Sequence, residues 1–240
     1  MKKIKGKHVL IVTSGSSLKK YWDKIKKFID EENVIIIGCN VINDFLTPDY
    51  HFWGSSKRWK KHGNKVSKKS IMVFPSDTDE GLIRKHWEGS YKTCDISKRL
   101  PGSDIKSHRT IYHYFKNVGM VAILWAYMKK ASKISVVGMD GYTFYSKDKL
   151  KNKDNSQHCY GKGFTDAIAS STLPNFLKHI ESRDKDSDAF YEASIKKDMD
   201  IYKTLRAINE YGAKFEILTP TVYKDFYNPD ILGIEEKYER

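Results

Sequence analysis

Several short groups of small, polar and aromatic residues in this sequence could bind and transfer a phosphorylated ligand. The first is Ser14-Gly15-Ser16-Ser17, where a glycine permits close backbone approach and hydroxyls can hydrogen-bond a phosphate. It lacks the Gly-x-Gly-x-x-Gly of a dinucleotide site and the lysine of a P-loop. Because serine is also a favoured N-cap residue, the group predicts either a turn that binds phosphate or substrate, or one that only caps a helix.

The richest group runs from Gly138 to Tyr145. It places the carboxylate of Asp140 between glycines, with the phenols of Tyr142 and Tyr145 close behind. A phenol can hydrogen-bond a departing phosphate and stabilise the negative charge that develops on it. Asp140 could instead only cap a loop, so this group predicts a phosphate-binding site or a capped turn.

Two asparagines stand where an amide could bind a ligand. Asn40 follows an apolar run and could bind a base, a ribose or a sugar hydroxyl, although it could equally close a turn. Asn117 and Gly119 open a strongly apolar segment, where a side-chain amide and backbone N–H groups could face an anion. Simple N-capping by Asn117 is the alternative.

Candidates for proton transfer and metal binding are fewer. His158 lies in a polar stretch, and the pKa of histidine near neutrality suits a general base. Asp-x-Asp triplets begin at Asp77, Asp184, Asp186 and Asp198. Such pairs bind metals in many nucleotide-sugar enzymes, but in a chain rich in aspartate they also arise by chance, which we favour here. The three cysteines are scattered and predict neither disulfides nor a zinc site.

The hydrophobic pattern predicts the elements that must position these groups. Apolar, β-branched runs predict strands over residues 8–13, 34–39, 49–54, 70–74, 133–138 and 214–218. Helical spacing predicts helices over residues 18–29, 118–128 and 199–211. The run at 34–39 has no alternation, as expected for a parallel strand buried on both faces. The fold class is therefore α/β, with a mostly parallel sheet whose carboxyl edge carries the polar groups.

The remaining segments and the composition predict one domain over residues 1–240. Residues 76–110 show few periodic signals and predict a loop-rich insertion, and the polar stretch at about 146–190 predicts a partly flexible lid. No apolar run approaches the length of a membrane span and no signal peptide opens the chain, which indicates a cytoplasmic protein. The net charge of +13 comes mostly from scattered lysines, which favours a solvated surface over a polyanion site.

In their order along the chain, these segments resemble the bacterial sialyltransferases of glycosyltransferase family 42 and related sialyltransferase-like domains from surface-polysaccharide loci. The likeness is carried by Val9 to Leu18, Gly38-Cys39-Asn40, Val118 to Met128, Ile134 to Tyr142, Asp154 to Gly161, and the closing helix and strand up to Pro220. It implies a single Rossmann-like domain of the GT-A variant kind. It also implies an inverting glycosyltransferase that needs no divalent metal or other cofactor.

The resemblance assigns roles to the candidate residues. The implied substrates are a CMP-activated donor with a sialic-acid-like sugar and a glycan or lipid-linked acceptor, as in lipopolysaccharide biosynthesis. Ser14, Gly15, Ser16 and Asn40 would bind nucleotide and sugar, Asn117 and Gly119 would lie near the donor, Gly138 and Asp140 would bind the cytidine, Tyr142 or Tyr145 would contact the leaving phosphate, and His158 would be the base.

The implied partners are that donor, a glycan or lipid-linked acceptor, and an anionic membrane met at its inner face. A homo-oligomer stays open.

Two other functions stay open at this point. The basic group Lys57-Arg58-Trp59-Lys60-Lys61-His62 could bind nucleic acid, with lysines on phosphates and Trp59 stacked on a base. The turn from Gly15 to Leu18 and the strand entry at Pro48-Asp49-Tyr50 are also similar to archaeal pterin diphosphokinases. That resemblance would imply magnesium held by Asp77, Asp79 or Asp140.

Overall fold

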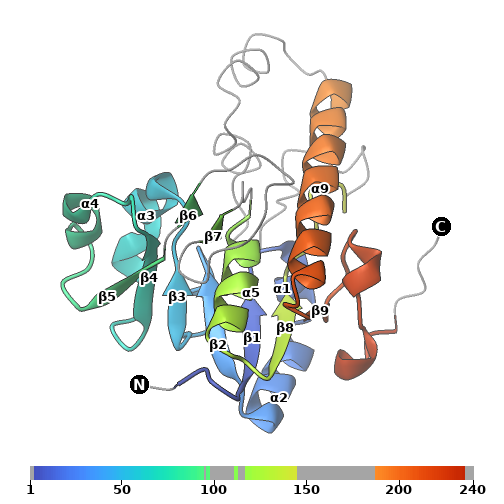
Figure 1. Cartoon of the computed structure of the whole chain (residues 1–240), viewed down its shortest axis with the longest axis horizontal. Helices are drawn as coiled ribbons and strands as arrows, with labels where there is room; N and C mark the ends of the chain where they lie inside the picture. The colour runs from blue at the N-terminus through green and yellow to red at the C-terminus, as the bar shows by residue number, and fades with distance from the viewer. Residues whose placement is uncertain (1–2, 95, 98–110, 113–116, 145–186, 236–240) are drawn as a thin grey trace.

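The computed structural model describes residues 3–94, 96–97, 111–112, 117–144 and 187–235 (Figure 1). Within them, seven strands form one sheet in the order β5-β4-β3-β2-β1-β8-β9, and every pairing is parallel. The strands are β1 (His8–Val12), β2 (Ile35–Cys39), β3 (Tyr50–Phe52), β4 (Ile71–Pro75), β5 (Tyr91–Cys94), β8 (Lys133–Val137) and β9 (Glu216–Ile217). Two short strands, β6 (Ile96–Ser97) and β7 (Ile111–Tyr112), pair separately. The α/β prediction is confirmed, and the sheet is wholly parallel.

Helices cover both faces of this sheet (Figure 1). The helices are α1 (Ser16–Lys20), α2 (Trp22–Glu32), α3 (Ser56–His62), α4 (Glu80–Arg84), α5 (Val118–Met128) and α9 (Ser187–Glu210), with 3-10 turns η1 (Gly63–Lys65), η2 (Lys224–Phe226) and η3 (Asp230–Leu232). In β1, Val9 and Ile11 pack with α5 and α9, whereas Leu10 and Val12 pack with α1 and α2. A strand covered on both faces needs the uninterrupted apolar run seen in the sequence.

Helix α5 is the central helix of the core. Eight of its eleven residues, from Gly119 to Ala126, are buried, so the helix is apolar on nearly every side. The side chain of Asn117 accepts a hydrogen bond from the N–H of Gly119 at 2.7 Å and caps the helix. The helix predicted over residues 118–128 is confirmed.

The structure differs from the sequence prediction in three places. The edge strand β5 lies in the segment expected to be a loop-rich insertion, and of its four residues only Cys94 is buried, so it carries no clear hydrophobic pattern. The helix expected over residues 18–29 is two helices that meet at Tyr21. The helix predicted over residues 199–211 begins earlier, at Ser187, and its first predicted apolar residue, Met199, is 53% exposed, whereas Ile201 and Leu205 are fully buried.

The proposed lid at about 146–190 lies outside the described residues up to residue 186, and from Ser187 the chain is already α9. In the described part of the chain, no helix has the length and apolar character needed to cross a membrane.

The strand order places a topological switch point between β1 and β8. From β1 the chain adds strands outward through β2, β3, β4 and β5, and then returns to place β8 on the other side of β1. Val12 and Val137 are paired at the carboxyl ends of these two strands. The connections that follow β1 and β8 therefore leave in different directions and open a crevice, which is where open parallel sheets bind ligands.

Candidate functional site

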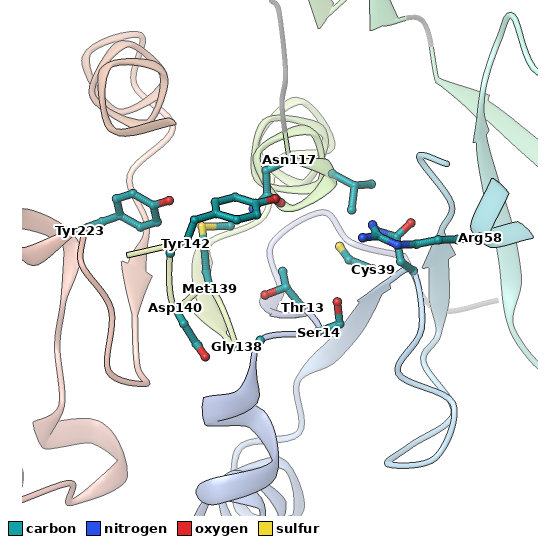
Figure 2. Close-up of a pocket in the computed structure, with 14 residues that line it drawn as sticks. Thr13, Ser14, Cys39, Arg58, Asn117, Gly138, Met139, Asp140, Tyr142 and Tyr223 are labelled. Carbon is teal, nitrogen blue, oxygen red and sulfur yellow. The ribbon is translucent and has the colours of Figure 1, made fainter. Parts of the chain in front are cut away.

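A pocket of about 90 Å³ lies at this switch point (Figure 2). Seven of the residues predicted from the sequence line it: Ser14, Gly15, Asn40, Asn117, Gly138, Asp140 and Tyr142. The rest of the lining is Thr13, Cys39, Arg58, Val118, Met139, Gly141 and Tyr223. Residues more than 200 positions apart in the chain therefore meet at the carboxyl edge of the sheet.

Two glycines form the floor of the pocket by bringing the loops after β1 and β8 into backbone contact. The N–H of Gly15 donates to the carbonyl oxygen of Gly138 at 2.9 Å. A Cβ added to Gly15 would lie only 2.2 Å from that oxygen. Gly138 has φ +75°, and a Cβ there would lie 2.2 Å from the carbonyl oxygen of Thr13. Neither position can hold a side chain without moving backbone, so both glycines are needed for this approach.

The carboxylate of Asp140 is turned toward α1 and bound there (Figure 2). Its Oδ2 accepts from the N–H of Ser17 at 2.8 Å and from the hydroxyl of Ser16 at 3.2 Å, and its Oδ1 accepts from the hydroxyl of Ser17. Burial raises the pKa of Asp140 to about 6, and the hydrogen bonds from Ser17 and Ser16 act in the opposite direction. The N–H groups expected to face a phosphate at this turn are therefore bonded to Asp140 and Gly138.

The loop after β9 closes one side of the pocket. The hydroxyl oxygen of Thr219 accepts from the N–H of Gly138 at 2.9 Å and lies 3.0 Å from the hydroxyl oxygen of Ser17. The hydroxyl of Thr221 donates to the carbonyl oxygen of Met139 at 2.7 Å. Both threonines are fully buried, so they fix the backbone of the β8 loop. Nothing in the local sequence of this segment indicates that role.

Asp198 of α9 holds the loop that carries Tyr142. Its Oδ1 accepts from the N–H of Tyr142 at 2.9 Å and from the hydroxyl of Tyr223 at 2.8 Å. Its Oδ2 accepts from the N–H and the hydroxyl of Thr143, both at 2.7 Å. Burial, and then the Asp198 carboxylate, raise the pKa of Tyr223 well above its usual value. The ammonium group of Lys197 lies 3.9 Å from the centre of the Tyr142 ring, within cation–π range.

Asn40 lines the pocket in a left-handed backbone conformation, with φ +55°. Asparagine adopts this conformation more readily than most residues, which accounts for its place directly after β2. Its Oδ1 accepts from the N–H of Gly54 at 3.3 Å. Its carbonyl oxygen accepts from Nε2 of His51 at 2.6 Å, and burial lowers the pKa of His51 to about 4, so this imidazole is neutral at pH 7.

Arg58 is a pocket residue that the sequence reasoning missed. It lies in the first turn of α3, where its N–H donates to the hydroxyl oxygen of Ser55 at 3.3 Å, and its side chain reaches into the pocket (Figure 2). In the sequence it belongs to the basic group over residues 57–62, for which nucleic-acid binding was the open alternative. Its position soon after the carboxyl end of β3 was the signal that could have found it.

The other predicted residues lie beside or outside the pocket. Ser16 is bonded to Asp140, as described above. Gly119 packs under the pocket, where a Cβ would lie 2.5 Å from Cε of Met139 and 2.9 Å from Cγ2 of Thr13. His158 and Tyr145 lie outside the described residues.

The structure also places the residues of the two alternative functions. Trp59 is buried and its indole N–H donates to the carbonyl oxygen of Leu82 at 2.9 Å, so the ring is not accessible for stacking on a base. Asp79 caps α4 by accepting from the N–H of Leu82 at 2.8 Å. Among the residues with described positions, no group of three or more His, Cys, Asp or Glu side chains could hold a metal ion.

Comparison with known proteins gives no further assignment. Neither a family model nor a curated protein sequence matches this chain. The geometry and chemistry of the pocket therefore carry the functional argument.

Proposed function

We propose that this protein is a sialyltransferase-like glycosyltransferase with a Rossmann-like domain of the GT-A variant kind. It transfers a sialic-acid-like sugar from a CMP-activated donor to a glycan or lipid-linked acceptor, with inversion and without a divalent metal. One observation supports this above all: the pocket at the β1/β8 switch point is lined by seven of the residues that the resemblance assigns to donor binding.

The form of the pocket suits a nucleotide-sugar. Gly15 and Gly138 line the pocket with backbone atoms and hold the loops after β1 and β8 together, so a flat ring or a sugar can lie against the backbone there. Amides and phenols surround that floor, and such groups hydrogen-bond ribose, sugar hydroxyls and phosphate. A hollow of about 90 Å³ holds a phosphate or part of a sugar ring, so a whole donor extends beyond it.

In this proposal the acceptor hydroxyl attacks the anomeric carbon as CMP departs. Tyr142 donates a hydrogen bond to the leaving phosphate, on which negative charge grows. Asp198 keeps Tyr142 in place through its backbone N–H. The roles of His158 as the base and of Tyr145 as a second phenol rest on the sequence resemblance alone.

Calorimetric titration in the presence of EDTA tests the binding half of the proposal. We expect CMP to bind more tightly than UMP, GMP or AMP, without added metal. Binding of NAD in preference to CMP, or no binding of CMP at millimolar concentration, would contradict it.

Release of CMP from CMP-N-acetylneuraminic acid tests the catalytic half. We expect Tyr142→Phe to lower kcat with little change in KM, because the phenol acts on charge that develops in the transition state. Tyr91→Phe is the matched control, since Tyr91 lies on the edge strand β5, away from the pocket. Equal kcat values for the wild type and Tyr142→Phe would remove Tyr142 from the mechanism.

A further inference from the structure

One end of the pocket gathers hydrogen-bond donors and positive charge. Arg58 extends into the pocket from the side opposite Tyr142 and Tyr223 (Figure 2). Asn40 and the first residues of α5 line the pocket with it. These groups lie in three places: in the loop after β2, in α3 after β3, and at the start of α5.

Close packing brings these three elements together. Asn40 accepts a hydrogen bond from the N–H of Gly54, so the loops after β2 and β3 are tied to each other. A Cβ on Gly54 would lie 3.2 Å from the Cβ of Val118, so the loop after β3 rests on the first turn of α5. Ser55 then starts α3 and places Arg58 one turn later. The position of Arg58 therefore follows from contacts on both sides of it.

The asparagines at this end present their donors rather than their acceptors. Asn40 and Asn117 each use the side-chain oxygen to accept a backbone N–H, from Gly54 and Gly119 respectively. That leaves the amide nitrogen as the outer group of each side chain. Asn40 lines the pocket and is only 6% exposed, so a ligand bound there can accept hydrogen bonds from its amide N–H groups.

The electrostatics of this end favour an anion. Helix α5 has eleven residues, and the N-terminus of such a helix carries a partial positive charge. Arg58 adds a full positive charge with donors in a planar fork that matches phosphate and carboxylate. The one acidic side chain in the lining, Asp140, is turned toward α1 and bonded to Ser16 and Ser17.

We infer that Arg58, Asn40 and the first turn of α5 form an anion subsite that binds a phosphate or carboxylate group of the ligand. The subsite deepens the proposed function and rests on it for the identity of the ligand: the anion is either the phosphate of CMP or the carboxylate of the donor sugar. Arg58 then makes the pocket selective for ligands that carry negative charge at this end.

Arg58→Gln tests the subsite, with Lys57→Gln as the matched control. Both variants remove one positive charge from neighbouring residues of α3, but Lys57 is exposed and does not line the pocket. The probes are inorganic phosphate, N-acetylneuraminate, CMP and cytidine, titrated by calorimetry at low ionic strength. Circular dichroism and thermal unfolding show whether each variant is folded. If Arg58→Gln does not fold, Arg58→Lys, which keeps the positive charge, takes its place in the titrations.

We expect Arg58→Gln to weaken binding of the anionic probe by about 10- to 100-fold, while cytidine and the Lys57→Gln protein are unaffected. Loss confined to inorganic phosphate and CMP assigns the subsite to the nucleotide phosphate. Loss confined to N-acetylneuraminate assigns it to the sugar carboxylate.

Two results would overturn the inference: equal affinities in Arg58→Gln and the wild type, or no saturable binding of any anion by the wild type. Failure of the proposed function looks different. If inorganic phosphate binds through Arg58 but no cytidine compound binds, the subsite stands and the CMP-dependent function fails.

Discussion

Replacing Asp198 by asparagine tests whether α9 fixes the loop that carries Tyr142 in the conformation seen in the structure. The carboxylate accepts four hydrogen bonds, two on each oxygen, from Tyr142, Thr143 and Tyr223. An asparagine of the same shape keeps one oxygen and turns an N–H₂ group toward the other two donors. The hydroxyl on that side can rotate and accept, but the backbone N–H cannot. Leaving one buried donor without an acceptor costs about 1–3 kcal/mol.

The expected result is a loss of about 1–3 kcal/mol in the free energy of unfolding, measured by urea denaturation. We also expect a fall in the rate of CMP release, because the loop that carries Tyr142 is no longer fixed. Asp77→Asn, at an exposed position outside the pocket, should change neither quantity. Equal stability of Asp198→Asn and the wild type would refute this account of the loop.

Three further predictions concern single residues. Gly15→Ala should destabilise the fold by about 1–3 kcal/mol or more and abolish ligand binding, because its Cβ would lie 2.2 Å from the Gly138 oxygen; Gly81→Ala, at an exposed position in α4, should not. Asp140 has a raised pKa of about 6, so the stability of the wild type relative to Asp140→Asn should fall as pH rises from 4 to 7, and a flat difference in unfolding free energy would count against it. His51 has a lowered pKa of about 4, so the stability that its neutral form contributes to the fold is lost as pH falls from 6.5 toward 4. The free energy of unfolding of His51→Gln should therefore fall less over this pH range than that of the wild type. Equal losses in the two proteins would contradict a buried, neutral His51.

The parallel sheet could be predicted from the sequence because its central strands are continuous apolar runs. Val9 to Val12 and Ile35 to Cys39 are nearly all buried, and burial on both faces demands such composition. Strand β5 could not be predicted, since an edge strand needs little buried surface. Its place in the sheet comes from pairing with β4, which the local sequence does not encode.

Pocket residues that directly follow a strand could be predicted from the sequence. Those that reach the pocket only through tertiary contacts could not. Gly15, Asn40 and Gly138 directly follow or lie near strand ends, so the parallel topology alone brings them together. Arg58 reaches the pocket through α3, and only its place soon after β3 indicates this; Tyr223 reaches it through the loop after β9, and no local pattern shows that path. Asp140 has the expected position, but its carboxylate serves α1.

A crystal structure of the protein with CMP would show directly whether the pocket binds the nucleotide. We expect the nucleotide to lie over Gly15 and Gly138 at the carboxyl ends of β1 and β8, with its phosphate in reach of Tyr142 or Arg58. A nucleotide bound elsewhere on the molecule, with this pocket empty, would contradict it.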